Sequence, residues 1–263
     1  MSPIPYEPQI EISHLGFAFS ADKTHLLKEI NLALRAGDRL GILGPSGSGK
    51  STLLKLVSGL LIPSQGEIRV DGELIKRQGL KQSRSFSQKM AMSFQKGGLL
   101  DAYNAWENID FALAELTDFS ESERKERSFH FLKQVGLSGS ENKRLKELSG
   151  GMLKRLSLAR VFALSPSILL LDDPTAGLDP VTADEIVSII EEYAENRSVI
   201  LIFASGDLAV SFRLANRLGF LWNGFLTYEQ SVYDFKKCDN PAIQQFIRGG
   251  LSGPLTEPVY ART

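Results

Sequence analysis

Two adjacent aspartates, Asp172 and Asp173, end the apolar run in "ILLLDDPTAGLDP", which covers residues 168–180. The four apolar residues before them have the length and composition of a buried strand. Carboxylates at the end of such a strand can bind a divalent cation, and a carboxylate can also accept a proton from water. The pair indicates a metal or phosphate site and leaves open whether that site is catalytic.

A glycine-rich segment, "GPSGSGKST", fits the pattern G-x-x-x-x-G-K-[ST] and lies between a strand-like run and a helical pattern. Its glycines let backbone N–H groups turn toward a phosphate, and the following helix N-terminus adds partial positive charge. Lys50 would reach the β- and γ-phosphates, and the Ser51 hydroxyl would bind Mg²⁺. The residues predicted to bind the nucleotide here are Gly44, Pro45, Ser46, Gly47, Ser48, Gly49, Lys50, Ser51 and Thr52.

With this loop 120 residues upstream, Asp172 is predicted to hold the Mg²⁺ through water or Ser51. The alternative is a helix-capping or turn aspartate before Pro174. A second anion site is predicted at "LSGGM", where a serine and two glycines open a helical pattern and expose N–H groups. The alternative there is an N-cap serine without a ligand. The segment consists of Leu148, Ser149, Gly150, Gly151 and Met152.

The elements around these sites alternate between strand and helix, which predicts a parallel sheet covered by helices. Strand-like stretches near the N-terminus predict an antiparallel edge that leads into a core strand. The predicted strands are 9–20, 29–34, 39–43, 168–172, 198–203 and a short one near 218–221, and the predicted helices are 50–59, 180–194 and one from Asp207, with a mostly helical lobe over 104–164.

The 263 residues include 30 basic and 31 acidic side chains, which argues against a protein that holds nucleic acid mainly through net positive charge and leaves a local basic patch open. The single cysteine, Cys238, cannot form an internal disulfide. The N-terminal sequence lacks the features of a signal peptide, and the apolar runs are far shorter than the ~20 residues that cross a bilayer. We expect a cytoplasmic protein whose membrane role, if any, is peripheral.

The order of these motifs resembles that of the nucleotide-binding subunit of ABC transporters, over nearly all of the chain up to about residue 228. "GPSGSGKST" resembles the Walker A motif of this family, "LSGGM" its signature and "ILLLDD" its Walker B motif. Gln95 in "MSFQKGG" resembles the Q-loop glutamine, and "AGLD", ending at Asp179, the D-loop. Phe19 lies where the family has an aromatic residue that stacks on the base.

The resemblance implies an α/β fold: a P-loop NTPase core with a mainly parallel sheet, an antiparallel β edge subdomain and a helical signature subdomain over about 100–164. It implies a loose N-terminus over 1–8, an ABC ATPase domain over 9–228 and a C-terminal extension over 229–263. It also implies a head-to-tail dimer, in which the signature of one subunit closes on the ATP of the other. Mg²⁺ would be bound by Ser51, Gln95 and Asp172, and Lys50, Gln95 and Asp173 would be catalytic.

Three segments point to a narrower group, the Mla-type, Mce-associated lipid-transport ATPases, which act with a membrane permease beneath a lipid-binding protein. They are "LSGGM", "FQKGGLLDAYNAWENI" and the tail "NPAIQQFIRGGLSGP". The tail is expected to contact a partner subunit; the alternative is an amphipathic helix packed on its own domain. In the family, the region of Leu99, Leu100, Trp106, Ile109 and Phe111 accepts a coupling helix of the permease, although core packing explains some of these residues equally well.

Two positions depart from the family pattern. Asp173 occupies the place of a glutamate that polarises the attacking water, and aspartate is one methylene shorter. Gly206, in "IFASGDL", occupies the place of the switch histidine and has no side chain to contact the γ-phosphate. One interpretation is a slow ATPase that drives lipid transport. The other is an ATP-binding clamp or regulatory subunit, or one half of a heterodimer with one degenerate site.

Overall fold

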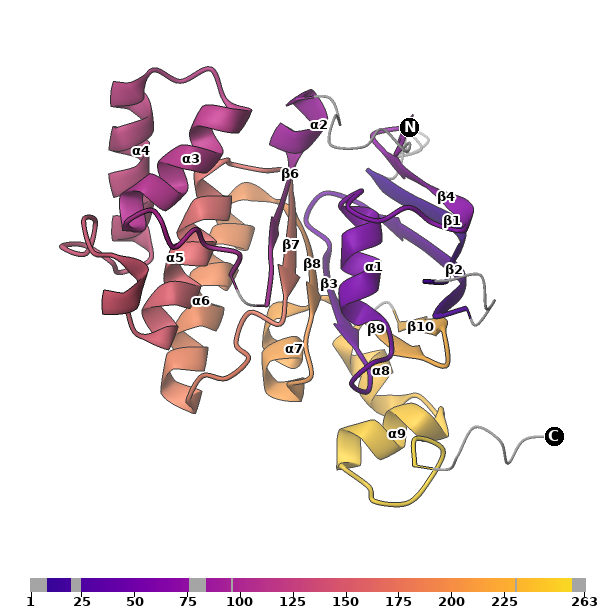
Figure 1. The fold of residues 1–263 in the computed structure, drawn as a ribbon. Helices are drawn as coiled ribbons and strands as arrows, with labels where there is room; N and C mark the ends of the chain where they lie inside the picture. Colours follow the sequence, from indigo (N-terminus) through magenta and orange to yellow (C-terminus); the bar gives the residue numbers. More distant parts are fainter. Residues whose placement is uncertain (1–8, 20–24, 76–83, 96, 230, 257–263) are drawn as a thin grey trace, which may run out of the picture. The chain divides into compact units, whose positions relative to one another are not determined.

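The computed structural model describes residues 9–19, 25–75, 84–95, 97–229 and 231–256, so the N-terminal segment 1–8 lies outside the described residues. The chain forms two compact units (Figure 1). The first unit comprises Met1–Arg35, Arg39–Ile75 and Ala204–Thr263, and the second comprises Ala36–Asp38 and Lys76–Phe203. Each phosphate-binding motif of the sequence therefore belongs to one identifiable unit.

An antiparallel sheet of four strands makes up part of the first unit, as predicted for the edge subdomain. Its strand order is β2-β1-β4-β5. Apolar residues that point to one face of these strands are buried, which gives the sheet one core-facing side. The strands are β1 (Ile10–Phe17), β2 (Leu27–Leu34), β4 (Gln65–Val70) and β5 (Glu73–Leu74).

The first unit also holds the strand that leads to the glycine loop. β3 (Arg39–Leu43) runs parallel to β9 (Arg217–Trp222), and β9 pairs antiparallel with β10 (Phe225–Glu229). The β9–β10 turn is Asn223-Gly224, with φ of 52° and 86°, as a two-residue hairpin turn of this handedness requires. The helices of this unit are α1 (Lys50–Val57), α7 (Leu208–Leu214), α8 (Val232–Lys237) and α9 (Pro241–Arg248).

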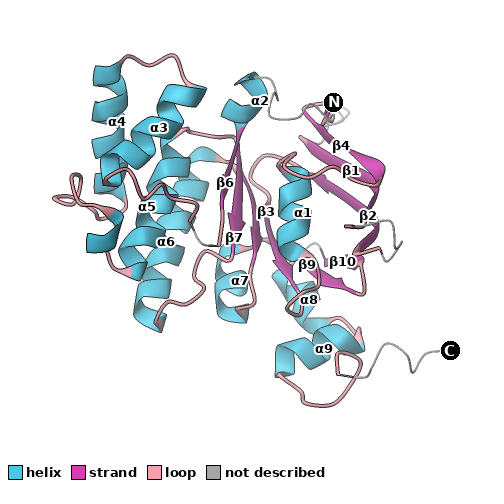
Figure 2. Cartoon of the chain, in the orientation of Figure 1, coloured by secondary structure: helices cyan, strands magenta, loops and turns pink. Residues whose placement is uncertain are grey.

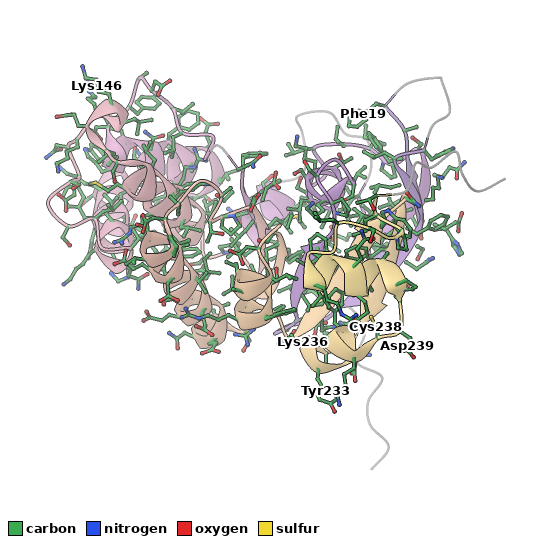
Figure 3. The ribbon with its side chains drawn as sticks, turned by 90° about the horizontal axis from the view of Figure 1, so that it is seen from below. Phe19, Lys146, Tyr233, Lys236, Cys238 and Asp239 are labelled. Carbon is green, nitrogen blue, oxygen red and sulfur yellow. The ribbon has the colours of Figure 1, made fainter. Side chains whose placement is uncertain are left out.

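The C-terminal helix α9 packs on its own unit. The ring of Phe246 lies 5.3 Å from that of Phe220 in β9, and Ile243 is fully buried. The structure thus contains the packing described by the alternative interpretation of the tail. Other side chains of this region stay exposed, including Tyr233 of α8 (Figure 3).

The second unit combines a parallel sheet with the helical lobe, and the P-loop NTPase fold class predicted from the sequence is confirmed. Its strands follow the order β8-β7-β6. Every residue of β7 and β8 is buried, as in a sheet covered on both faces. Its strands are β6 (Met90–Ser93), β7 (Ile168–Asp172) and β8 (Ile200–Ala204), and β8 ends at the sequence boundary between the units. Its helices are α2 (Arg84–Lys89), α3 (Ala105–Leu116), α4 (Glu121–Gln134), a 3₁₀ turn (Leu145–Glu147), α5 (Gly150–Ala163) and α6 (Pro180–Arg197) (Figure 2).

Within the described part of the chain, no helix has both the length and the apolarity needed to cross a bilayer.

The loop that enters α3 is held by the side chain of Asn108, which is fully buried. Its Nδ2 group donates to the carbonyl oxygens of Leu100, Tyr103 and Asn104 at 3.2, 3.3 and 2.9 Å. Its Oδ1 atom accepts from the Leu100 N–H at 2.8 Å. One amide therefore satisfies both the donor and the acceptors of a loop that follows the Q-loop.

We predict that Asn108→Ala lowers the free energy of unfolding by about 2 to 3 kcal/mol, because it removes a fully buried amide together with its four hydrogen bonds to the loop. Urea unfolding followed by circular dichroism measures the change. Asn142→Ala, at an exposed turn position, is the matched control and is expected to change stability by less than about 0.5 kcal/mol. Equal losses for the two variants would contradict this account of the loop.

Candidate functional site

The glycine loop of the first unit joins β3 to α1 in a backbone conformation that requires glycine at three positions. Gly44, Gly47 and Gly49 have φ of 146°, 78° and 105°. A Cβ atom at Gly44 would lie 2.3 Å from the carbonyl oxygen of Leu221 in β9. No other residue fits the first position without moving a buried strand, because backbone oxygen cannot yield as a flexible side chain does.

Two polar side chains of the loop show what it can bind. The Lys50 ammonium donates to the carbonyl oxygens of Gly44 and Pro45 at 2.7 and 2.9 Å, so the charge lies over the loop. Among the described residues, Ser48 Oγ is a buried side-chain atom without a hydrogen-bond partner. Buried hydroxyls are normally satisfied. A hydroxyl without a partner, two residues before the start of α1, fits the oxygen atoms of a phosphate.

Two further predicted residues lie in the first unit. Phe19 is 71% exposed (Figure 3). Its ring meets that of Phe17 edge-on, with the centroids 4.9 Å apart. Gly206 is exposed, with no atoms within 4 Å of the place where a Cβ would lie. Its neighbours are already engaged: the buried Ser205 Oγ accepts from the Asp207 N–H at 3.0 Å, and Asp207 Oδ1 caps α7 by accepting from Ala209 N–H at 2.8 Å.

The two aspartates of the second unit differ in environment. Asp172 ends β7 and is buried, whereas Asp173 follows it, half-buried, with a φ of 49°. This left-handed conformation turns the chain out of the sheet, and aspartate is one of the few residues other than glycine that adopt it readily. The two carboxylates therefore differ in their access to solvent.

Lys154 of α5 connects the second aspartate with the Q-loop. Its ammonium donates to the carbonyl oxygen of Gln95 at 2.6 Å and to that of Asp173 at 3.3 Å. Burial lowers the pKa of Lys154, and the neighbouring carboxylates of Asp173 and Asp172 act in the opposite direction. The Gln95 side chain itself is exposed. The structure thus brings together two predicted residues, Gln95 and Asp173, through a third that was not predicted.

The signature and the D-loop line one cavity of about 440 Å³ in the second unit. Ser149 caps α5, its Oγ accepting from the Met152 N–H at 3.3 Å. A Cβ at Gly151 would lie 2.7 Å from Thr182 Cγ2, so glycine permits the close approach of α5 and α6 there. Leu148 is buried and does not line the cavity. The cavity is lined by Ser149, Gly150, Gly151, Met152, Arg155, Gly177, Leu178, Asp179 and Thr182.

Asp179 of the D-loop caps α6. Its Oδ1 atom accepts from the N–H groups of Val181 and Thr182 at 3.1 and 3.0 Å, and its Oδ2 accepts from the Thr182 hydroxyl at 2.6 Å. These hydrogen bonds, that of the Thr182 hydroxyl first, lower the pKa of Asp179. The carboxylate is thereby kept charged at the edge of the cavity. Two helix N-termini, those of α5 and α6, open on this one cavity.

Sequence reasoning missed the polar side of α5. Lys154, Ser157 and Arg160 follow one another at three-residue intervals in an otherwise largely apolar helix. This spacing keeps them on one side of the helix, and it was the available signal. Their partners could not be read from the sequence, because they are backbone carbonyl groups about 60 residues away.

The predicted Mg²⁺ ligands are divided between the units: Ser51 in the first, Gln95 and Asp172 in the second. No cluster of three or more His, Cys, Asp or Glu side chains suited to a metal occurs in the part of the chain that is described. A hydroxyl, an amide and one carboxylate suit Mg²⁺, which keeps several water ligands and binds substrate phosphates.

Comparisons with known proteins identify the family of this chain. The family described as ABC transporter matches residues 27–176. "Protein TRIGALACTOSYLDIACYLGLYCEROL 3, chloroplastic" of Arabidopsis thaliana is 35% identical over 253 residues, covering 90% of this chain and 73% of that protein. "Methionine import ATP-binding protein MetN 2" of Enterococcus faecalis is 36% identical over 242 residues, covering 91% of this chain and 70% of that protein.

Among solved structures, the fold is similar to the dimeric, post-hydrolysis state of the ATP-binding cassette MJ0796 bound to ADP and Pi. The TM-score is 0.75 at 27% identity, covering 84% of this chain and 98% of that chain. The glycine loop, the signature cavity and the family match lead to one conclusion. The chain belongs to the ABC transporter family, as an ATP-binding cassette whose ATP hydrolysis is coupled to transport.

Proposed function

We propose that this cassette drives the transport of phospholipid or another lipid, as a head-to-tail dimer attached to a membrane permease. The observation that supports a head-to-tail dimer is that one chain has two helix N-termini suited to binding phosphate. One is the glycine loop before α1, and the other is the Ser149 end of α5, which opens on the signature cavity. A second copy supplies the signature end to the ATP bound by the first.

The lipid substrate rests on two lines of support. The Arabidopsis relative is named for a glycolipid, trigalactosyldiacylglycerol. The segments "LSGGM" and "NPAIQQFIRGGLSGP" resemble those of the Mla-type, Mce-associated ATPases. The Enterococcus relative is named for methionine import at a similar identity, so a small polar substrate is the outcome that a transport experiment must separate from a lipid.

ATP binding falls to the first unit. The loop from Gly44 to Thr52 surrounds the phosphates with N–H groups, and the Ser48 hydroxyl is a donor without a protein partner. Lys50, which now donates to two loop carbonyls, would exchange them for β- and γ-phosphate oxygens, to which a charged donor binds more strongly. Phe19, exposed beside Phe17, would stack on the base.

Catalysis needs a metal ligand set and a water-orienting group. We assign Ser51, Gln95 and Asp172 to Mg²⁺, which supplies neutralisation of charge on the β- and γ-phosphates when bound. We assign Asp173 to the attacking water, with Lys154 holding its backbone. Because Asp173 is short for this role and Gly206 offers no side chain, we expect slow hydrolysis, in which electrostatic stabilisation by Lys50 and the partner's Ser149 does most of the work.

Contact with the permease is proposed for the surface after the Q-loop. Phe111 is 43% exposed there, whereas Ile109 is fully buried and belongs to the core. Trp106 is half-buried, 6.5 Å from Phe129 and under the ammonium of Lys125, so it packs within the helical lobe. The proposed location is peripheral, on the inner face of the cytoplasmic membrane. The extension 229–263 is proposed to add a partner contact, and an Mce-type protein would be reached through the permease.

We predict that Asp173→Asn reduces steady-state ATP hydrolysis by about 10² to 10⁴-fold, because amides do not accept the proton of the attacking water. Asp173→Glu, one methylene longer, is expected to equal or exceed the wild type. Phosphate release by the purified protein, with and without its permease, measures both rates.

Lys50→Ala sets the background for that experiment, and equilibrium binding of labelled ATP shows whether each variant still holds nucleotide. Hydrolysis by Asp173→Asn at the wild-type rate would contradict the role of Asp173. Binding of ATP by the wild type with hydrolysis no higher than that of Lys50→Ala would instead favour a clamp or one half of a heterodimer.

We also predict that the cassette, reconstituted with its permease in liposomes, moves fluorescent phospholipid in an ATP-dependent manner that Lys50→Ala abolishes. Uptake of radiolabelled methionine, measured in the same liposomes, is the competing activity. ATP-dependent methionine uptake without lipid movement would contradict the lipid assignment and leave the ATPase assignment intact.

A further inference from the structure

One side of α5 holds the backbone of the Q-loop. Lys154 Nζ donates to the carbonyl oxygen of Gln95 at 2.6 Å, and Ser157 Oγ donates to that of Gly97 at 3.2 Å. Arg160 donates through its two terminal nitrogens to the carbonyl oxygens of Gly98 and Gly97 at 2.7 and 2.6 Å. The helix that begins at the signature is thus bound to the Q-loop by three side chains spaced three residues apart.

The Q-loop backbone is shaped for these bonds. Gly97 and Gly98 have φ of 77° and 59°, and the Gly97 N–H closes a turn on the Phe94 carbonyl oxygen at 2.7 Å. A Cβ at Gly98 would lie 3.1 Å from the Phe94 ring and 3.5 Å from the Arg160 guanidinium. The two glycines therefore let the carbonyl groups turn toward α5 at close range.

Two of the three donors, Lys154 and Arg160, are cations whose charged form is disfavoured by partial burial. Burial is the first cause that lowers the pKa of Lys154, and it also lowers the pKa of Arg160. Removing a cation partly from water costs free energy, which bonds to neutral carbonyl groups offset only in part. A role beyond stability is therefore worth seeking for these side chains.

Lys154 differs from the other two because it also contacts the residue that follows β7. Its ammonium also donates to the carbonyl oxygen of Asp173 at 3.3 Å, and the Asp172 and Asp173 carboxylates attract its charge. Asp173 lies in the left-handed region, with φ of 49°, where the chain turns out of the sheet, and the bond from Lys154 holds its carbonyl group at that turn. A single ammonium thus connects the Q-loop, the signature helix and the residue after β7.

We propose that Lys154 is a positioning residue for ATP hydrolysis, which holds the backbone of Gln95 and Asp173 in a fixed place relative to the signature helix. The proposal rests on the roles proposed above for Gln95 and Asp173. Any ligand that shifts the Ser149 end of α5 then shifts the two residues with it, because the link is direct and charge-assisted. Lys154 touches neither substrate nor metal in this role.

The test compares Lys154→Met, which keeps an unbranched chain without a donor, with Lys154→Arg, which keeps charge and reach. Lys154→Met is expected to lower kcat for ATP hydrolysis about 10²-fold, as a misplacement of reacting groups by about 1 Å can. The KM for ATP is expected to change less than about threefold, because the ATP-binding loop belongs to the other unit. Lys154→Arg is expected to recover most of the lost kcat.

A readout without nucleotide accompanies the kinetics. Hydrogen exchange of peptides covering residues 93–99 and 172–176 is expected to be faster in Lys154→Met than in the wild type, with other peptides unchanged. Lys133→Met, an exposed lysine on α4, is the matched control and is expected to keep wild-type kcat and exchange. The urea midpoint of each variant shows whether the fold is retained.

Wild-type kcat in Lys154→Met would overturn the proposal, whether or not exchange is faster. A kcat loss matched by a lower urea midpoint and faster exchange throughout the chain would also overturn it, since the role would then be structural. Failure of the proposed function is seen separately: Asp173→Asn would hydrolyse ATP at the wild-type rate. The positioning role is supported if Lys154→Met lowers kcat, Lys154→Arg restores most of it, and hydrogen exchange is faster only in the peptides covering residues 93–99 and 172–176.

Discussion

A buried strand can offer charged or phosphate-binding groups only where it leaves the apolar core, and this constraint places the chemistry of the cassette. In the first unit, β3 is almost entirely buried and leads directly to Gly44. In the second, β7 is buried to its last residue, Asp172. Polar groups placed earlier in either strand would lie in the core without partners, at a cost of several kcal/mol for a charge. The glycine loop and the aspartate pair therefore lie at the ends of buried strands, where their polar groups can leave the core.

Helix N-termini supply the complementary half of the chemistry. The glycine loop ends at Lys50, the first residue of α1, and the N-termini of α5 and α6 open on one cavity. α5 also acts along its length: Ser149 caps its start, and Lys154 and Arg160 bind the Q-loop farther on. α5 thus connects the signature cavity with the backbone of Gln95 and Asp173. This is the kind of physical connection that coupling between sites requires.

The sequence predicted the parts whose pattern is local. The apolar runs of β3 and β7, the glycine loop and the start of α6 at Pro180 all lie where expected, because burial and turn chemistry are written in neighbouring residues. The short strands β4, β5 and β6 were not predicted, since a few partly polar residues become strands only through their neighbours in the sheet. The contact of Lys154 with Gln95, 59 residues apart, was equally invisible, because its acceptor is a backbone carbonyl.

The central claim is that two copies of this chain enclose ATP between the glycine loop of one and the signature of the other. Cysteine cross-linking tests it most directly, with Ser46→Cys in one copy, Gly150→Cys in the other, Cys238 replaced by serine and Asp173→Asn to slow turnover. Both positions are exposed. The account predicts that a mixed dimer cross-links with ATP and Mg²⁺ and that Lys50→Ala in the Ser46→Cys copy abolishes the link. ATP binding without any cross-link between these positions would contradict it.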